Sequence, residues 1–184
     1  LYAADMGAKV MNNSWGGGGY AQVLQDAIVT ADQAGALFVA AAGNESTNND
    51  WFPSYPTNHD VPNVLSVAAT DSYDHIAVFS NYGAATVHLG APGVGILSTV
   101  PTVGSFCCSD PSGYKLLSGT SMAAPHVSGV AALVWSARPT LTAAQVRGLM
   151  ESSAKDLGAA GRDRDSGYGL VQAAEALEAL ERLP

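Results

Sequence analysis

The sequence predicts an α/β fold, built as a doubly wound, mostly parallel sheet with helices on both of its faces. Two observations lead to this prediction. Strand-like apolar runs alternate with segments of helical periodicity, as in parallel sheets whose strands are joined by helices. The runs at residues 36–44 and 63–70 are also apolar along most of their length, which is typical of strands buried on both faces. Ligands of such sheets bind beyond the carboxyl ends of the strands, where the candidate site is therefore expected.

The strands are expected within the first 117 residues. Residues 1–15 resemble the tail of a helix that runs into a strand and ends in a polar corner. Residues 20–35 carry apolar side chains at helical spacing and end at Gly35, a common stop signal. Asn, Ser, Thr and Pro dominate residues 44–62, which predicts a long loop. Further strands are expected at residues 77–83, 86–93 and 95–100, and residues 102–117 alternate between turns and short strands, with a hairpin as one arrangement.

Three helices are predicted to close the chain, at residues 120–137, 142–153 and 170–183. Pro125 is tolerated only in the first turn of a helix, so the first of them must begin near Thr120 or Ser121. That helix is apolar on every face, and we therefore expect it to be central and buried. Thr142 opens the next helix with a capping-box pattern.

Composition excludes several classes of protein. A chain of 184 residues that is 47% hydrophobic suits one ordinary domain, and no linker divides it. The net charge of −8, with only 8 Lys and Arg residues, argues against a nucleic-acid partner. Apolar runs stay shorter than the roughly 18 residues that cross a membrane, so no membrane partner is expected.

Cys107 and Cys108 are adjacent in the sequence. Three states are compatible with this: a strained vicinal disulfide, two free thiols, or disulfide bonds to cysteines outside this chain.

The stretch "SGTSMAAPHVSGVAAL", residues 118–133, places Ser121 at the start of the apolar helix. Unpaired N–H groups and the helix dipole favour developing negative charge there, which suits a nucleophile. Taken alone, "GTS" before a helix would more often be only an N-cap. The sixteen residues around Ser121 as a whole closely resemble the segment around the catalytic serine of the subtilisin-like serine proteases, the subtilases.

The resemblance continues through "NNSWGG", "FVAAAGNES", "NVLSVAAT", "FSNYG", "LGAPGVGILST" and "GYGLVQAAEAL", in the order of the family and over essentially the whole chain. It implies the subtilisin-like fold and a serine endopeptidase that acts on polypeptides, is secreted and requires no cofactor for its chemistry. Ser121 would be the nucleophile, and the Asn44 side chain would donate to the oxyanion together with the Ser121 N–H. Six residues would line the pocket for the substrate side chain, namely Ser14, Trp15, Gly16, Ala41, Ala42 and Gly43.

The base and the carboxylate that should complete the triad are not found in the expected motifs. In subtilases a His-Gly-Thr-His-type motif and an Asp-Thr/Ser-Gly motif precede the serine. His126 lies about 140° around the helix from Ser121, so it should point away into packing. His59, His75 and His88 are interpreted as surface or structural residues, and the Asp165–Ser166–Gly167 match lies after the serine, in a loop expected to be a solvated turn.

We therefore expect residues 1–184 to be the C-terminal portion of one subtilase catalytic domain, with the N-terminal strands absent. The Asp and His would come from a missing segment of the same domain or from another chain, and this chain alone should be inactive. The alternative is an inactive module that binds peptides or assembles with another chain. Many subtilases hold structural calcium, but His88 stands near the carboxylate expected before "APG", so that metal site is doubtful here. The small pocket residues lead us to expect a preference for apolar or aromatic side chains.

Overall fold

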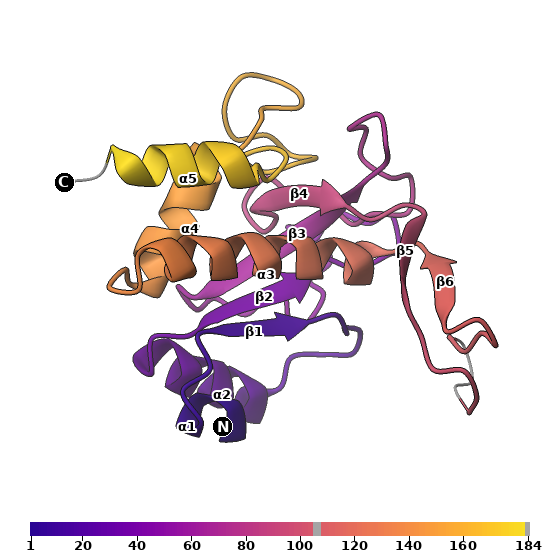
Figure 1. The fold of residues 1–184 in the computed structure, drawn as a ribbon, viewed down its shortest axis with the longest axis horizontal. Coiled ribbons are helices and arrows are strands. Elements are labelled where there is room, and N and C mark those ends of the chain that lie inside the picture. The colour runs from indigo at the N-terminus through magenta and orange to yellow at the C-terminus, as the bar shows by residue number, and fades with distance from the viewer. Residues whose placement is uncertain (105–107, 183–184) are drawn as a thin grey trace.

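The computed structural model describes residues 1–104 and 108–182, and its centre is a parallel sheet between layers of helices (Figure 1). The strands run in the order β1 (Val10–Asn13), β2 (Leu37–Ala41), β3 (Val64–Thr70) and β4 (Leu89–Pro92). All three pairings are parallel, and Asn13 of β1 lies beside Ala40 of β2. The predicted parallel α/β sheet is confirmed. The reversal of strand order that defines double winding does not occur among these four strands.

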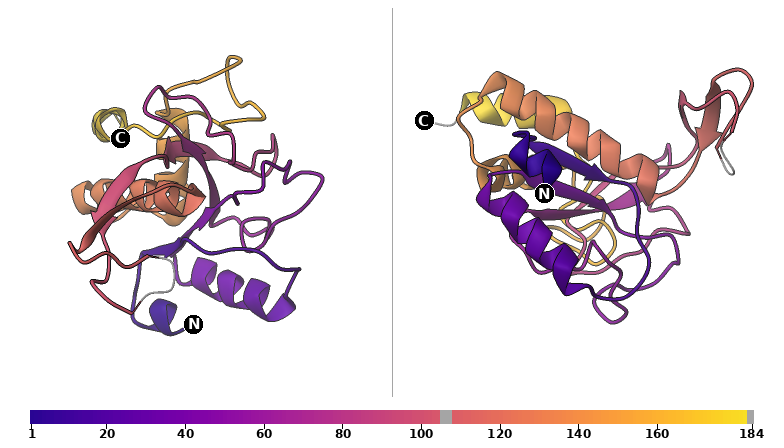
Figure 2. Two further views of the ribbon diagram at one scale, coloured as in Figure 1. Left: turned by 90° about the vertical axis from the view of Figure 1, so that its right-hand side faces the viewer. Right: turned by 90° about the horizontal axis from the view of Figure 1, so that it is seen from below.

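Helices cover both faces of this sheet. In the right-hand view of Figure 2, α2 and α3 lie on opposite sides of it. Alternate residues of β2 divide between the two faces: Val39 joins the core under the last three helices, while Phe38 packs with Ile28 of α2. The helices are α1 (Tyr2–Asp5), α2 (Gln22–Gln33), α3 (Thr120–Ala137), α4 (Ala143–Ser152) and α5 (Ala173–Glu181).

Helix α3 packs against all four strands of the sheet. Its start at Thr120 agrees with the sequence prediction, but Pro125 is the sixth residue of α3 and lies inside the helix, not in its first turn. The missing N–H of Pro125 leaves the Ser121 carbonyl without its usual helical partner, and that oxygen accepts a hydrogen bond from the Ser14 hydroxyl instead. Its sheet-facing side is buried, as for Ala124 and Val127, but Leu133 is 51% exposed. The expectation that every face is buried is therefore wrong, because only one side of α3 lies on the sheet. Thr142 caps α4 with the predicted capping box.

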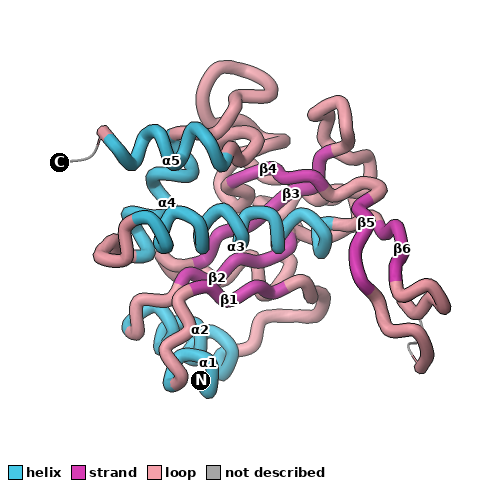
Figure 3. The backbone as a smooth tube through the Cα atoms, in the orientation of Figure 1, coloured by secondary structure: helices cyan, strands magenta, loops and turns pink. Residues whose placement is uncertain are grey.

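Strands β5 (Ile96–Thr99) and β6 (Tyr114–Leu117) form an antiparallel pair that projects from the main body (Figure 3). The strand expected at residues 95–100 is confirmed, but the hairpin expected within residues 102–117 is not found among the described residues, because β6 pairs with β5, which lies before that segment. Cys107 lies outside the described residues. Residues 77–83 form no strand, contrary to expectation, and instead run beside the loop after β2, with a bridge between Asn48 and Tyr82. No helix of the described ranges is long and apolar enough to span a bilayer.

Candidate active site

Ser121 is the second residue of α3 and is half-buried. Its hydroxyl donates a hydrogen bond to the main-chain oxygen of Ser14, with 3.0 Å between the two oxygens. The Ser14 hydroxyl donates in return to the main-chain oxygen of Ser121, at 2.7 Å. These reciprocal bonds join the carboxyl end of β1 to the start of α3. They bring Ser121 to the sheet edge where ligands of parallel sheets bind.

Asn44 follows β2 and reaches the same helix start. Its Oδ1 accepts hydrogen bonds from the N–H of Thr120, at 2.8 Å, and from the Thr120 hydroxyl, at 3.0 Å. Because the oxygen faces these donors, the amide nitrogen is the other arm of the side chain, and it makes no hydrogen bond to the described residues. Asn44 therefore presents an N–H donor close to Ser121, at the positive end of a long helix.

A cavity of about 60 Å³ lies between these segments. Ser121 and four of the six predicted pocket residues, Trp15, Gly16, Ala41 and Gly43, line this cavity. The other two predicted pocket residues, Ser14 and Ala42, do not line it. Ala42 is fully buried, and its carbonyl accepts hydrogen bonds from two Asn side chains. The lining comprises Trp15, Gly16, Gly17, Ala41, Gly43, Asn44, Glu45, Ser54, Thr120 and Ser121.

Sequence reasoning missed Gly17, Glu45, Ser54 and Thr120 in this lining. Glu45 adds a carboxylate to a pocket whose small residues predict a preference for apolar or aromatic side chains. One of its oxygens, Oε2, accepts hydrogen bonds from the Asn44 N–H and from a buried Asn side chain, both at 2.9 Å. From the sequence, Glu45 could have been assigned to this site only by its position directly after Asn44. Ser54 gave no comparable signal, because its approach depends on the path of the loop.

A second cavity, of about 340 Å³, also borders Ser121. Its lining combines the start of α3 with β5, and includes Ile96, Leu97, Ser98, Met122, Pro125 and His126. His126 is exposed, so the expectation that it points into packing is wrong. Its Nδ1 lies 2.9 Å from the main-chain oxygen of Met122, to which it donates, so the neutral ring carries its free lone pair on Nε2. Among the described residues, no hydrogen bond joins this ring to Ser121.

The other histidines lie in environments that suit structural or surface roles. His59 is 3% exposed, its ring centroid is 4.8 Å from that of Tyr55, and its Nδ1 is 3.2 Å from Oε1 of Gln25. Burial lowers the pKa of His59. His75 is exposed and lies 3.7 Å from Asp71. Within the described parts of the chain, none of the hydrogen bonds of these side chains reaches Ser121.

His88 stands where the family resemblance would place a calcium-binding carboxylate. Its Nδ1 accepts a hydrogen bond from the N–H of Ser66 at 2.9 Å, so the neutral ring carries its proton on Nε2. Burial, followed by the charges of Arg147 and Arg162, lowers the pKa of His88 to about 3. The side chain is therefore neutral at physiological pH.

The Arg147 side chain also bonds to main-chain carbonyl oxygens near His88. Its Nη1 donates to the carbonyl oxygens of Pro62 and Val64, at 2.9 and 2.8 Å. Carbonyl oxygens are typical calcium ligands, but here a guanidinium already occupies them, and His88 offers no negative charge. Residues 1–104 and 108–182 also contain no group of three or more His, Cys, Asp or Glu side chains that could hold a metal ion.

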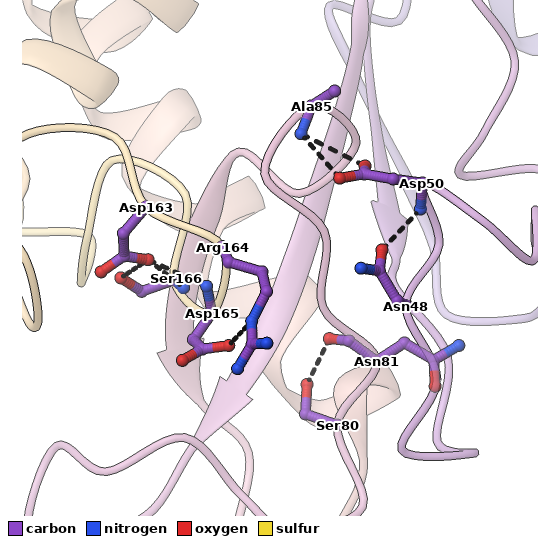
Figure 4. Close-up of polar contacts among 9 residues, drawn as sticks. All are labelled: Asn48, Asp50, Ser80, Asn81, Ala85, Asp163, Arg164, Asp165 and Ser166. Atoms are coloured by element: carbon purple, nitrogen blue, oxygen red, sulfur yellow. Dashed lines mark hydrogen bonds and ion pairs between the residues drawn. The ribbon is translucent and has the colours of Figure 1, made fainter.

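The loop with the Asp165–Ser166–Gly167 match is closed on itself (Figure 4). Oδ1 of Asp163 accepts hydrogen bonds from the N–H groups of Asp165 and Ser166 and from the Ser166 hydroxyl, while Asp165 pairs with Arg164 at 2.9 Å. The expected turn is confirmed, but it is only partly solvated, because Ser166 and Gly167 are buried while Asp165 is exposed.

Fold and site together define an α/β protein that presents a helix-mounted serine and an asparagine amide at the carboxyl edge of a parallel sheet. The model of the subtilase family matches residues 1–169. The chain is 40% identical to fervidolysin from Fervidobacterium pennivorans and 39% identical to thermitase from Thermoactinomyces vulgaris, over 97% and 93% of its length. The chain belongs to the subtilase family of serine proteases.

Solved structures agree with this assignment. The crystal structure of fervidolysin matches 96% of the chain with a TM-score of 0.82 and 40% identity. A protease from Pseudoalteromonas arctica matches 94% of the chain with a TM-score of 0.81 and 36% identity. The chain spans only 26% of the curated fervidolysin sequence and 57% of thermitase.

Proposed function

We propose that this chain is the part of a serine endopeptidase that carries the nucleophile, the oxyanion site and the substrate pocket. The observation that carries the proposal is the convergence of Ser121 and Asn44 at the start of α3, where two hydrogen bonds from Thr120 hold the Asn44 oxygen. Ser14, Trp15, Gly16, Ala41, Ala42 and Gly43 would form or support the pocket.

Ser121 would attack a peptide carbonyl carbon. The bond between Oγ and carbon forms while the hydroxyl proton passes to a histidine, and the carbonyl oxygen becomes an oxyanion that the Asn44 amide and the Ser121 N–H stabilise. The C–N bond then breaks as the histidine gives its proton to the leaving amine, and water hydrolyses the acyl-enzyme. Before the attack, the hydroxyl must turn from Ser14 O toward the base.

The histidine and its carboxylate would come from a segment outside this chain. Support comes from the described histidines, none of which is bonded to Ser121, and from the 340 Å³ cavity that borders Ser121 and could receive such a side chain. The substrate would be a polypeptide and the enzyme extracellular, as the name of a 46% identical relative, the extracellular basic protease of Dichelobacter nodosus, suggests.

The experiment is hydrolysis of a set of fluorogenic peptides by this chain, alone and after refolding with a subtilase segment that carries the Asp-Thr/Ser-Gly and His-Gly-Thr-His-type motifs. We expect turnover only in the mixture, and none when Ser121→Ala replaces the wild-type chain. Apolar or aromatic side chains before the scissile bond should be preferred. Folded mixtures that bind peptides without cleaving them would favour the alternative, an inactive peptide-binding or assembly module.

A further inference from the structure

The buried side chain of Asn81 makes several hydrogen bonds to the turn that carries Asn44. Asn81 is 1% exposed and lies in the segment that runs beside the loop after β2. Its Oδ1 accepts hydrogen bonds from the N–H groups of Glu45, at 2.9 Å, and Thr47, at 3.1 Å. The oxygen therefore fixes the main chain immediately after Asn44.

The amide nitrogen of Asn81 is equally engaged. It donates to the Ala42 carbonyl at 3.2 Å, to Oε2 of Glu45 at 2.9 Å and to Oδ1 of Asn49 at 3.0 Å. The main-chain N–H of Asn81 donates to the Gly43 carbonyl at 3.0 Å. Asn81 therefore forms hydrogen bonds with the main chain on both sides of Asn44. A carboxamide suits this position because it carries an acceptor oxygen and a two-proton donor nitrogen on one planar group.

Asn81 is itself anchored to the sheet. The Ser80 hydroxyl donates to the Asn81 carbonyl, as Figure 4 shows, and accepts a hydrogen bond from the N–H of Ala69 in β3. Further along, the Asp50 carboxylate accepts hydrogen bonds from the N–H groups of Ala85 and Thr86. The two segments are therefore joined at Asn81 and again at Asp50, and of these two contacts the one at Asn81 lies beside Asn44.

Gly43 shows how closely the turn packs on this side chain. Its φ is +114°, and a Cβ on Gly43 would lie 2.3 Å from Nδ2 of Asn81. A change in the Asn81 side chain would therefore shift the turn and, with it, the Asn44 carboxamide whose oxygen accepts from Thr120.

We propose that Asn81 is a positioning residue, which orients the Asn44 carboxamide toward the reaction centre at Ser121 without touching the substrate. This inference deepens the proposed function and rests on it for the role of Asn44 as an oxyanion donor.

The first test measures hydrogen exchange in this chain and needs no activity. The variant is Asn81→Ser, and the matched control is Asn63→Ser. Asn63 is also buried, at 2% exposure, and donates to the Ala36 carbonyl just before β2, at the opposite end of that strand. After correction for global stability, the Thr120 amide should lose about tenfold protection or more in Asn81→Ser only. Equal protection in both variants would overturn the proposal.

The second test uses the active, reconstituted protein. Asn81→Ser should lower kcat about tenfold and change KM by less than about threefold, because misplacement of a transition-state donor acts on the chemical step. In an Asn44→Ala background the same change should lower kcat by less than about twofold. Equal losses in both backgrounds would contradict a role through Asn44. If the wild-type protein shows no turnover, the proposed function fails, while the exchange comparison still decides whether Asn81 sets the turn.

Discussion

The buried histidine His88 should make the chain less stable in mild acid. Its folded-state pKa of about 3 lies below the ordinary value of 6.5. The unfolded chain therefore binds a proton between these values that the folded chain does not, and stability falls as the pH falls through this window. The slope is about 1.4 kcal/mol per pH unit, so going from pH 7.5 to pH 5 costs about 2 kcal/mol from this one group.

The matched variant is His88→Asn, whose side-chain oxygen can accept the Ser66 N–H in place of Nδ1 but does not titrate. Urea unfolding of both proteins between pH 7.5 and pH 5 gives the difference in unfolding free energy. We expect this difference to shift by about 2 kcal/mol in favour of the variant as the pH falls, because all other titrating groups are shared. Parallel stability curves would refute the argument that His88 is buried in its neutral form.

Three further predictions concern the site. Asn44→Ala in the active protein should lower kcat by about 10²–10³-fold, the loss known for the equivalent donor in subtilisin, and an unchanged kcat would exclude Asn44 from the oxyanion site. Gly43→Ala should lower the unfolding free energy by about 2 kcal/mol or more in urea titrations, because the new Cβ meets Asn81 at a positive φ, and wild-type stability would show that the turn adapts freely. His126→Ala should change fluorophosphonate labelling of Ser121 in the refolded mixture by less than about twofold, since no hydrogen bond joins the His126 ring to Ser121 among the described residues, whereas loss of labelling would make His126 the base.

The sequence predicts the elements well where local signals are strong. The extent of α3 follows from the apolar run, and the cap of α4 follows from Thr142 and the residue three positions on. Pro125 is a poor guide to the start of α3, because it lies inside the helix and not in its first turn. The strands β2 and β3 are found because burial on both faces leaves a continuous apolar pattern. In each case the residues that determine the element lie within it.

The residues that sequence reasoning missed depend on contacts distant in the chain. Ser54 reaches the small cavity only through the path of the 44–62 loop, and Asn81 supports Asn44 from 37 positions further along. The segment around Asn81 has a strand-like composition, yet its hydrogen bonds go to the neighbouring loop instead of a sheet. Periodicity reports which side chains are buried, but it does not report the partners of a buried amide.

The most direct measurement is labelling with a fluorophosphonate, with the modified residue mapped by mass spectrometry. The chain would be tested alone and after refolding with the segment that carries the triad Asp and His motifs. We predict labelling of Ser121 in the refolded mixture only, because the serine then gains a base while the oxyanion donors are already in place. Labelling of another residue, of the isolated chain, or of nothing in a folded mixture would contradict the assignment of Ser121 as a nucleophile that depends on a base from outside this chain.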